Sequence, residues 1–142
     1  MARCGGVVDV LIDSSVWIAA DRPRTKEHRT LIELIRGTEH RVCVCAPIRA
    51  EVCQGAREQA QFEALWSGFQ GFIDLPIRED HWEQCAWNYF RCRKRGMTLS
   101  TIDCLIATLA STYRVPLWTV DKAFKMMREV VAFEVFEPRS VG

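Results

Sequence analysis

The sequence predicts an α/β fold with a mainly parallel central sheet of about five strands that is covered by helices. Short apolar runs rich in β-branched residues alternate with longer segments of helical periodicity, which is the pattern of strand–helix–strand units. The chain has 142 residues, of which 49% are hydrophobic, so it can bury one core without disulfides. We therefore expect residues 1–142 to form a single domain.

The first strand is expected at residues 7–12, an apolar, β-branched run that ends at Asp13, where a helix begins. The next helix starts at about Glu27 and ends at Gly37, because glycine commonly follows the last turn of a helix. Residues 41–46 have the composition of a second strand. This order is typical of the first unit of a parallel sheet.

A helix is expected to begin at Pro47, because the amide hydrogen that proline lacks has no partner in a first helical turn. Glu51 lies one turn into this helix. A further helix is expected at residues 57–69. The short apolar run at residues 72–77 is predicted to be a third strand.

A surface helix is expected at residues 81–95, because apolar side chains recur there at helical spacing. Its basic residues fall outside the apolar stripe. The stripe predicted to pack on the core consists of Trp82, Cys85, Ala86, Tyr89 and Phe90.

The following helix is expected to be capped by Ser100 or Thr101, with Asp103 in its first turn. Its predicted buried face consists of Ile102, Leu105, Ile106 and Leu109. The last elements are a strand, a short helix and a final strand, at residues 115–120, 121–129 and 130–136.

Four acidic residues stand at the edges of apolar segments, where packing alone does not favour a charge: Asp13, Glu51, Asp103 and Asp121. Ligands bind outside the carboxyl ends of parallel strands, and Asp13 and Asp121 directly follow predicted strands. Helices that follow such strands start at the same edge, which places Glu51 and, by inference, Asp103 there. The helix dipole also stabilises a first-turn carboxylate by up to about 1 kcal/mol, which is a sufficient structural explanation for Asp103 alone.

Clustered carboxylates without histidine are typical of sites for Mg²⁺ and other hard divalent cations. Repulsion among these carboxylates raises the pKa of at least one of them, and a cation relieves it. A bound cation also activates water for attack on a phosphate. The residues themselves therefore predict metal-dependent phosphodiester hydrolysis.

The formal net charge of +1 gives no overall attraction to nucleic acid, so binding would depend on local basic clusters. The strongest cluster precedes the Asp103 helix, and its alternative interpretation is a solvated helix face. It consists of Arg91, Arg93, Lys94 and Arg95. A second basic group consists of Arg22, Arg24, Lys26 and Arg29. The tryptophans lie in apolar segments and are expected in the core or in a subunit interface.

The seven cysteines include no Cys-x-x-Cys pair and have no histidine at ligand spacing. We expect reduced, mostly buried thiols, since a chain of this length needs no disulfide. The three histidines are scattered, which disfavours metal-independent acid–base cleavage of RNA.

The four acids lie in the motifs LIDSSVWI, PIRAEVCQG, RGMTLSTIDCLIATLA and PLWTVDKAF. In order and spacing these motifs resemble those of PIN-domain ribonucleases, specifically VapC-type toxins of type II toxin–antitoxin systems, over nearly the whole chain. The resemblance implies a three-layer α/β/α PIN-like domain and Mg²⁺- or Mn²⁺-dependent endoribonuclease activity on structured RNA, either tRNA or rRNA. It also implies a homodimer and neutralisation by a cognate VapB-like antitoxin.

In this resemblance Asp13 and Asp103 match the principal metal ligands, Glu51 matches the acid that binds metal or orients water, and Asp121 matches the fourth acid. The chain departs from many relatives at Ala123, where they have a further acid. The polar neighbours that match supporting residues are Ser14 and Thr119.

Two other functions are alternatives to the nuclease. A phosphatase of the haloacid dehalogenase type needs an Asp-x-Asp sequence after the first strand, and Ser15 occupies the second of those positions. A non-catalytic PIN-like module would bind RNA or protein without cleavage, although the four retained acids disfavour it.

The apolar start of the chain is interrupted by Asp9 and Asp13, so it does not form a signal peptide. No segment reaches the roughly 18 apolar residues of a membrane span. We therefore expect a cytoplasmic protein. Many relatives begin almost at the first strand, so residues 1–6 point to a start codon further downstream.

Overall fold

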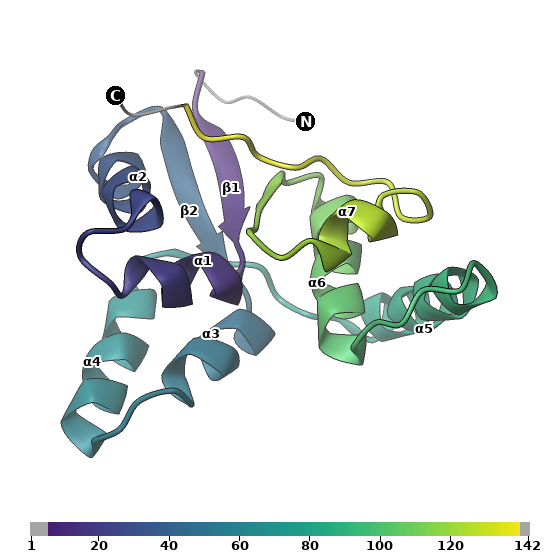
Figure 1. The fold of residues 1–142 in the computed structure, drawn as a ribbon, viewed down its shortest axis with the longest axis horizontal. Helices are drawn as coiled ribbons and strands as arrows, with labels where there is room; N and C mark the ends of the chain where they lie inside the picture. Colours follow the sequence, from purple (N-terminus) through teal and green to yellow (C-terminus); the bar gives the residue numbers. More distant parts are fainter. Residues whose placement is uncertain (1–5, 140–142) are drawn as a thin grey trace.

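The computed structural model describes residues 6–139, so Cys4 and most of the segment 1–6 lie outside the described residues. The central sheet in the described part has four strands in the order β3-β2-β1-β4, paired in parallel (Figure 1). A parallel sheet is therefore confirmed, with four strands instead of five. The strands are β1 (Val8–Ile12), β2 (His40–Val44), β3 (Ile73–Asp74) and β4 (Leu117–Trp118).

The helices fall close to their predicted positions. Glycine and proline act as expected, since Gly37 caps the end of the second helix and proline occupies the first turn of the third. Within residues 6–139, no helix combines the length and apolar composition needed to cross a bilayer. The helices are α1 (Ser14–Ala20), α2 (Lys26–Arg36), α3 (Ala46–Cys53), α4 (Gln59–Phe69), α5 (Glu79–Lys94), α6 (Thr101–Tyr113) and α7 (Ala123–Met127).

Alternate side chains of β1 face two different cores, because successive residues of a strand point to opposite faces of the sheet. Leu11 packs in the core formed with α6 and α7, whereas Val10 and Ile12 pack in the core formed with α1 and α2. Figure 1 shows α2 on one side of β1 and β2 and α6 on the other. The molecule is therefore built in three layers, as predicted.

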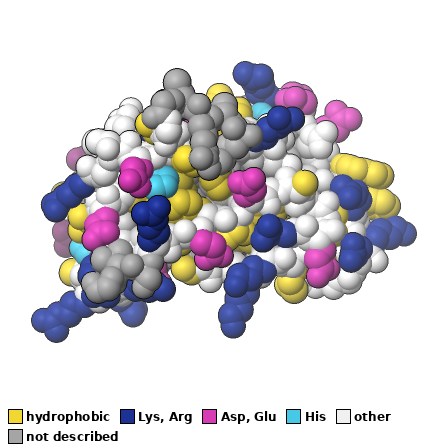
Figure 2. Space-filling view, turned by 90° about the horizontal axis from the view of Figure 1, so that it is seen from above, with side chains coloured by type: hydrophobic (Ala, Val, Ile, Leu, Met, Phe, Trp, Pro, Cys, Tyr) yellow, Lys and Arg dark blue, Asp and Glu magenta, His cyan; other side chains and the backbone are white. Residues whose placement is uncertain are grey.

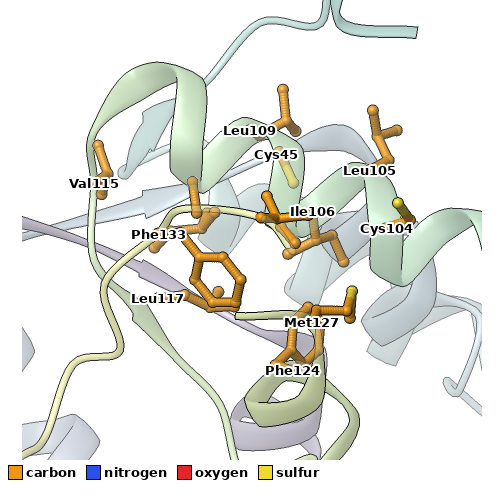
Figure 3. Close-up of a cluster of buried hydrophobic side chains, with 14 of the residues drawn as sticks. Cys45, Cys104, Leu105, Ile106, Leu109, Val115, Leu117, Phe124, Met127 and Phe133 are labelled. Atoms are coloured by element: carbon orange, nitrogen blue, oxygen red, sulfur yellow. The ribbon is translucent and has the colours of Figure 1, made fainter. Parts of the chain in front are cut away.

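Helix α6 lies at the centre of the larger core. All residues from Cys104 to Ala110 are buried, and Phe124, Met127 and Phe133 close over this helix (Figure 3). The predicted buried face is correct except for Ile102, which is 36% exposed because it lies in the first turn, before the helix enters the core.

The cysteines of the described part are free thiols and are buried, as predicted. Burial raises the pKa of the Cys43, Cys45 and Cys104 thiols to about 12. These side chains therefore stay protonated at neutral pH and pack as small apolar groups.

The strand predicted at residues 130–136 is wrong. This segment forms one isolated bridge between Val135 and Leu117, in which the Leu117 N–H donates to Glu134 O (2.9 Å) and the Phe136 N–H donates to Leu117 O (2.8 Å). Strand β4 has only two residues, so it offers the last segment too little backbone for a ladder. Val131 and Phe133 of this segment are buried by packing instead.

The apolar stripe predicted for α5 is also largely wrong. Trp82 is 44% exposed and Phe90 is 49% exposed, whereas the buried side of the helix carries polar residues. There Asn88 donates from Nδ2 to Thr108 Oγ1 (3.1 Å), and His81 Nδ1 accepts from the Arg78 N–H (2.9 Å). The buried polar groups are satisfied, so the core accepts them in place of the aromatic rings.

Candidate functional site

Asp13 ends β1 and occupies the N-cap position of α1. Its side chain is only 3% exposed, and its Oδ2 accepts hydrogen bonds from Ser15 Oγ (2.6 Å) and Thr119 Oγ1 (2.9 Å). Its backbone N–H donates to Trp118 O on β4 (2.9 Å). Two hydroxyl groups and two strands therefore fix the position of this carboxylate.

Ser15 and Thr119 connect the loop after β4 to the start of α1. The two hydroxyl oxygens lie 3.3 Å apart. Ser15 Oγ accepts from the Val120 N–H (3.2 Å), and Thr119 Oγ1 accepts from the Asp121 N–H (3.0 Å). Sequence reasoning included Thr119 in the site and missed Ser15. The signal for Ser15 was its place directly after the first strand, two residues from Asp13.

Glu51 reaches the same edge of the sheet from α3. Its Oε1 accepts a hydrogen bond from Ser14 Oγ (3.2 Å), which places Ser14 beside the carboxylate. Burial raises the pKa of Glu51, the negative charges of Asp13 and Asp103 raise it further, and the Ser14 hydroxyl opposes the shift.

Asp103 lies in the first turn of α6, where Ser100 is the N-cap and accepts from the Asp103 N–H (3.0 Å). Burial raises the pKa of the Asp103 carboxyl, with further contributions from the charges of Asp121 and Asp13. The Ser100 side chain opposes this shift. A role at the start of the helix alone does not explain why Asp103 lies near other carboxylates, whose negative charges raise its pKa.

Asp121 lies in the exposed turn between β4 and α7. Its Oδ1 accepts from the Ala123 N–H (2.9 Å), so the position at which many relatives have an acid contributes a backbone donor here. This hydrogen bond fixes the turn and uses only one of the two carboxylate oxygens of Asp121.

The structure thus brings the four predicted acids to one edge of the sheet, where the carboxyl ends of β1 and β2 point toward α1 and α3 in Figure 1. None of the interactions that shift the pKa of Glu51 or of Asp103 comes from a Lys or Arg of residues 6–139. The groups that shift the pKa of Glu51 and Asp103 are thus mostly other carboxylates, and this accumulation of negative charge favours a cation.

The donors at this edge are carboxylates and hydroxyls, the oxygen ligands that Mg²⁺ prefers, so their chemistry fits a divalent cation. Within residues 6–139, however, no three His, Cys, Asp or Glu side chains come close enough together to form a ready-made metal site. Ligation by several acids would require rotation of their side chains toward a common point.

The basic cluster at the end of α5 is exposed, and its members interact with residues other than the four acids. Arg95 pairs with Glu129 (3.4 Å), and Lys94 Nζ lies 5.5 Å from the centre of the Phe90 ring. Arg91 and Arg93 are exposed on the same helix, which extends away from the strands in Figure 1. No hydrogen bond or ion pair of the described part links this cluster to the four acids.

Three lysines that the fold brings together lie closer to the acids than the α5 cluster does. A cleft of about 290 Å³ is lined by Thr119 and Asp121, together with three lysines from α2, the turn after β4 and α7. Sequence reasoning missed two of these lysines because they are isolated in the chain and meet only in the fold. The lysines are Lys26, Lys122 and Lys125.

The parallel sheet, the helices on both of its faces and the acids at its carboxyl edge define an α/β protein of the three-layer class. The family model of the PIN domain matches residues 10–130, and the chain therefore belongs to the PIN domain family. No curated protein sequence matches the chain.

Solved structures of toxin–antitoxin proteins have the same fold. VapBC-5 from Mycobacterium tuberculosis aligns with a TM-score of 0.66 and 20% identity over 91% of this chain and 98% of that chain. VapBC-1 from nontypeable Haemophilus influenzae aligns with a TM-score of 0.72 and 16% identity over 92% and 98%. VapC20 from M. tuberculosis, described as a sarcin-ricin loop cleaving toxin, aligns with a TM-score of 0.60 and 14% identity over 82% and 92%.

Ser15→Ala is expected to lower the activity of the site by about 10–100-fold, the usual effect of removing a group that orients a ligand. The variant removes one of the two hydroxyl donors to Asp13 and the acceptor of the Val120 N–H. The initial rate of RNA cleavage measures this effect. Ser67→Ala, on the exposed surface of α4, is the matched control. Equal rates for both variants would contradict an orienting role for Ser15.

Proposed function

We propose that this protein is a Mg²⁺- or Mn²⁺-dependent endoribonuclease that cleaves structured RNA, and that it acts as the toxin of a toxin–antitoxin pair. The observation that carries the proposal is the group of four carboxylates, delivered by four separate segments to one sheet edge, with raised pKa values at Glu51 and Asp103. A structural role for these acids gives no reason to place their charges within reach of one another.

Asp13, Glu51, Asp103 and Asp121 would hold the cation. When bound, a divalent cation supplies positive charge opposite the phosphate and lowers the pKa of water. Ser15 and Thr119 keep the Asp13 carboxylate oriented, and Ser14 does the same for Glu51. Glu51, with its raised pKa, is the side chain best suited to orient water or to accept its proton.

The proposed partners are a VapB-like antitoxin and a second copy of the chain. Support for the antitoxin comes from the similar folds of proteins described as VapBC, such as VapBC-5 and VapBC-1. Support for self-association comes from large aromatic side chains that stay exposed, such as Trp87 and Phe90.

Cleavage of purified tRNA and rRNA by the antitoxin-free protein tests the proposed activity. Discrete products in Mg²⁺ or Mn²⁺ that disappear with EDTA are expected. Folded protein that gives no products in either metal would contradict the proposal. It would favour the non-catalytic binding module, for which the absence of a ready-made metal site within residues 6–139 is the supporting observation.

Lys122→Ala combined with Lys125→Ala is expected to weaken RNA binding and to reduce its salt dependence. Each lost phosphate contact lowers the slope of log K against log salt concentration by about 0.7 for a single strand. The substitutions are made in a catalytically inactive variant, and its RNA affinity is measured at several salt concentrations. These measurements give the affinity and its salt dependence. Replacement of Arg91, Lys94 and Arg95 by Ala tests the α5 cluster in parallel. An unchanged slope for a set of variants would exclude that set from the RNA path.

A further inference from the structure

The outward face of α5 exposes two large aromatic rings. Trp87 is 57% exposed and Phe90 is 49% exposed, and their rings stack with centroids 5.6 Å apart and planes inclined by 20°. Both lie opposite the side of α5 that packs on α6. Stacked, exposed aromatic rings of this size on one helix face are typical of a surface that is covered by a partner.

Charged residues continue this face in both directions. Asp80 and Glu83 lie toward the start of α5, and Arg91 and Lys94 lie toward its end. At 3.6 residues per turn, all four point within about 40° of the direction of Trp87. Asp80, Glu83, Arg91 and Lys94 form no ion pair within residues 6–139, and Lys94 Nζ lies over the Phe90 ring.

The charges are arranged symmetrically about Trp87. Asp80 lies seven residues before Trp87 and Lys94 lies seven residues after it, whereas Glu83 and Arg91 lie four residues before and after it. A second α5, packed antiparallel and centred on Trp87, would therefore place Asp80 opposite Lys94 and Glu83 opposite Arg91 at both ends. This is the self-complementary pattern that a twofold interface requires.

We infer that two copies of this chain pair through this face of α5, antiparallel and in register at Trp87. The inference rests on the proposed homodimer and names its interface. A hollow of about 630 Å³ along the face is lined by Glu83, Gln84, Ala86 and Trp87, among others. The same register sets Phe90 of the second copy opposite Gln84, at the wall of this hollow.

A second copy fits this face better than RNA does. Asp80 and Glu83 would repel phosphates over half of the face, whereas in the antiparallel pair every acid meets a base. Figure 2 shows hydrophobic and basic side chains gathered at the end of the molecule where α5 lies. The assignment gives Arg91 and Lys94 a partner other than the RNA substrate.

Charge reversal tests the pairing. Asp80→Lys with Glu83→Lys makes the face entirely basic, and Arg91→Glu with Lys94→Glu makes it entirely acidic. Each variant alone is expected to be monomeric at concentrations at which the unaltered protein dimerises, because like charges then face each other. An equimolar mixture is expected to dimerise again, since the basic face complements the acidic one. Sedimentation velocity measures the oligomeric state, and circular dichroism verifies that each variant is folded.

Trp87→Ala tests the centre of the interface without changing charge. It is expected to raise the dimer dissociation constant by about 30-fold or more, the effect of removing a central aromatic anchor. Trp82→Ala is the matched control, because Trp82 lies on the same helix about 140° away from Trp87 and is also exposed. It should leave dimerisation unchanged.

The possible failures are distinguishable. Charge-reversed variants that stay dimeric, or a mixture that stays monomeric, would overturn the α5 pairing and leave the homodimer itself standing. An unaltered protein that is monomeric throughout the micromolar range would overturn both. RNA cleavage is measured separately, so its loss or retention does not decide the interface.

Discussion

Asp103→Asn is expected to reduce RNA cleavage by about 10³-fold, because the charge stabilisation that a divalent cation supplies to phosphoryl chemistry is worth several kcal/mol. The substitution keeps the size and shape of the side chain and removes the negative charge. Asp103 is the acid on which burial and the carboxylates of Asp13 and Asp121 act together. Single-turnover cleavage rates in excess Mg²⁺ measure the loss.

Asp9→Asn is the matched control for this experiment. Asp9 also belongs to the sheet, since it lies in β1. It is near the start of that strand, away from the carboxyl edge, and pairs with Arg41 (2.7 Å). An exposed ion pair of this kind contributes no more than about 1 kcal/mol to stability, so the control should keep full activity. If Asp103→Asn cleaved RNA as fast as Asp9→Asn, Asp103 would have no part in the reaction.

The same variant also separates chemistry from folding. In the metal-free protein Asp103→Asn should be at least as stable as the unaltered chain, because it removes a partly buried charge that lies among like charges. A variant that loses activity while its melting temperature holds or rises has lost a functional group. A variant that loses both would instead indicate damage to the start of α6.

The positions of the helices and of the acids could be predicted because local signals define them. Gly37 ends α2, Ser100 caps α6, and an apolar run followed at once by Asp13 marks the end of β1, whereas β4 ends at Trp118, three residues before Asp121. These features depend on backbone conformation within a few residues. They therefore depend little on the tertiary contacts made by the rest of the chain.

The errors arose where tertiary contacts decide the outcome. A helical repeat of aromatic residues in α5 predicted the buried side, but His81 and Asn88 are buried because they find hydrogen-bond partners on the backbone and on α6. Likewise, the last apolar segment has strand composition but only two residues of β4 beside it. Periodicity cannot show which of two faces has a partner.

In the site, the residue types could be predicted and the connections between them could not. The four acids are visible as charges in apolar contexts, whereas Ser15 is a common residue whose role depends on Thr119, more than 100 residues away in the chain. The same holds for Lys122 and Lys125, which meet Lys26 only across a cleft. Long-range pairs of this kind require the fold.

Mg²⁺ is expected to stabilise the protein at neutral pH and to lose this effect in acid. The folded state raises the pKa of Glu51 above its ordinary value of 4.5 and that of Asp103 above 3.8, so folding favours the protonated forms. These two groups therefore contribute stability below those ordinary values, and the contribution is lost as the pH rises through the raised pKa values. At neutral pH the metal-free protein carries the full repulsion, which a cation relieves.

A cation present at about 100 times its dissociation constant adds about 2.7 kcal/mol of stability, which corresponds to a rise of about 5–10 °C in melting temperature for a chain of this size. Melting curves with Mg²⁺ and with EDTA, recorded from acid to neutral pH, test this. The two curves should coincide in acid, where protons neutralise Glu51 and Asp103, and separate as the pH rises. In Asp103→Asn the separation should shrink at every pH. Equal melting temperatures with Mg²⁺ and EDTA at neutral pH, in protein that cleaves RNA, would mean that the acids do not bind the cation before the substrate arrives.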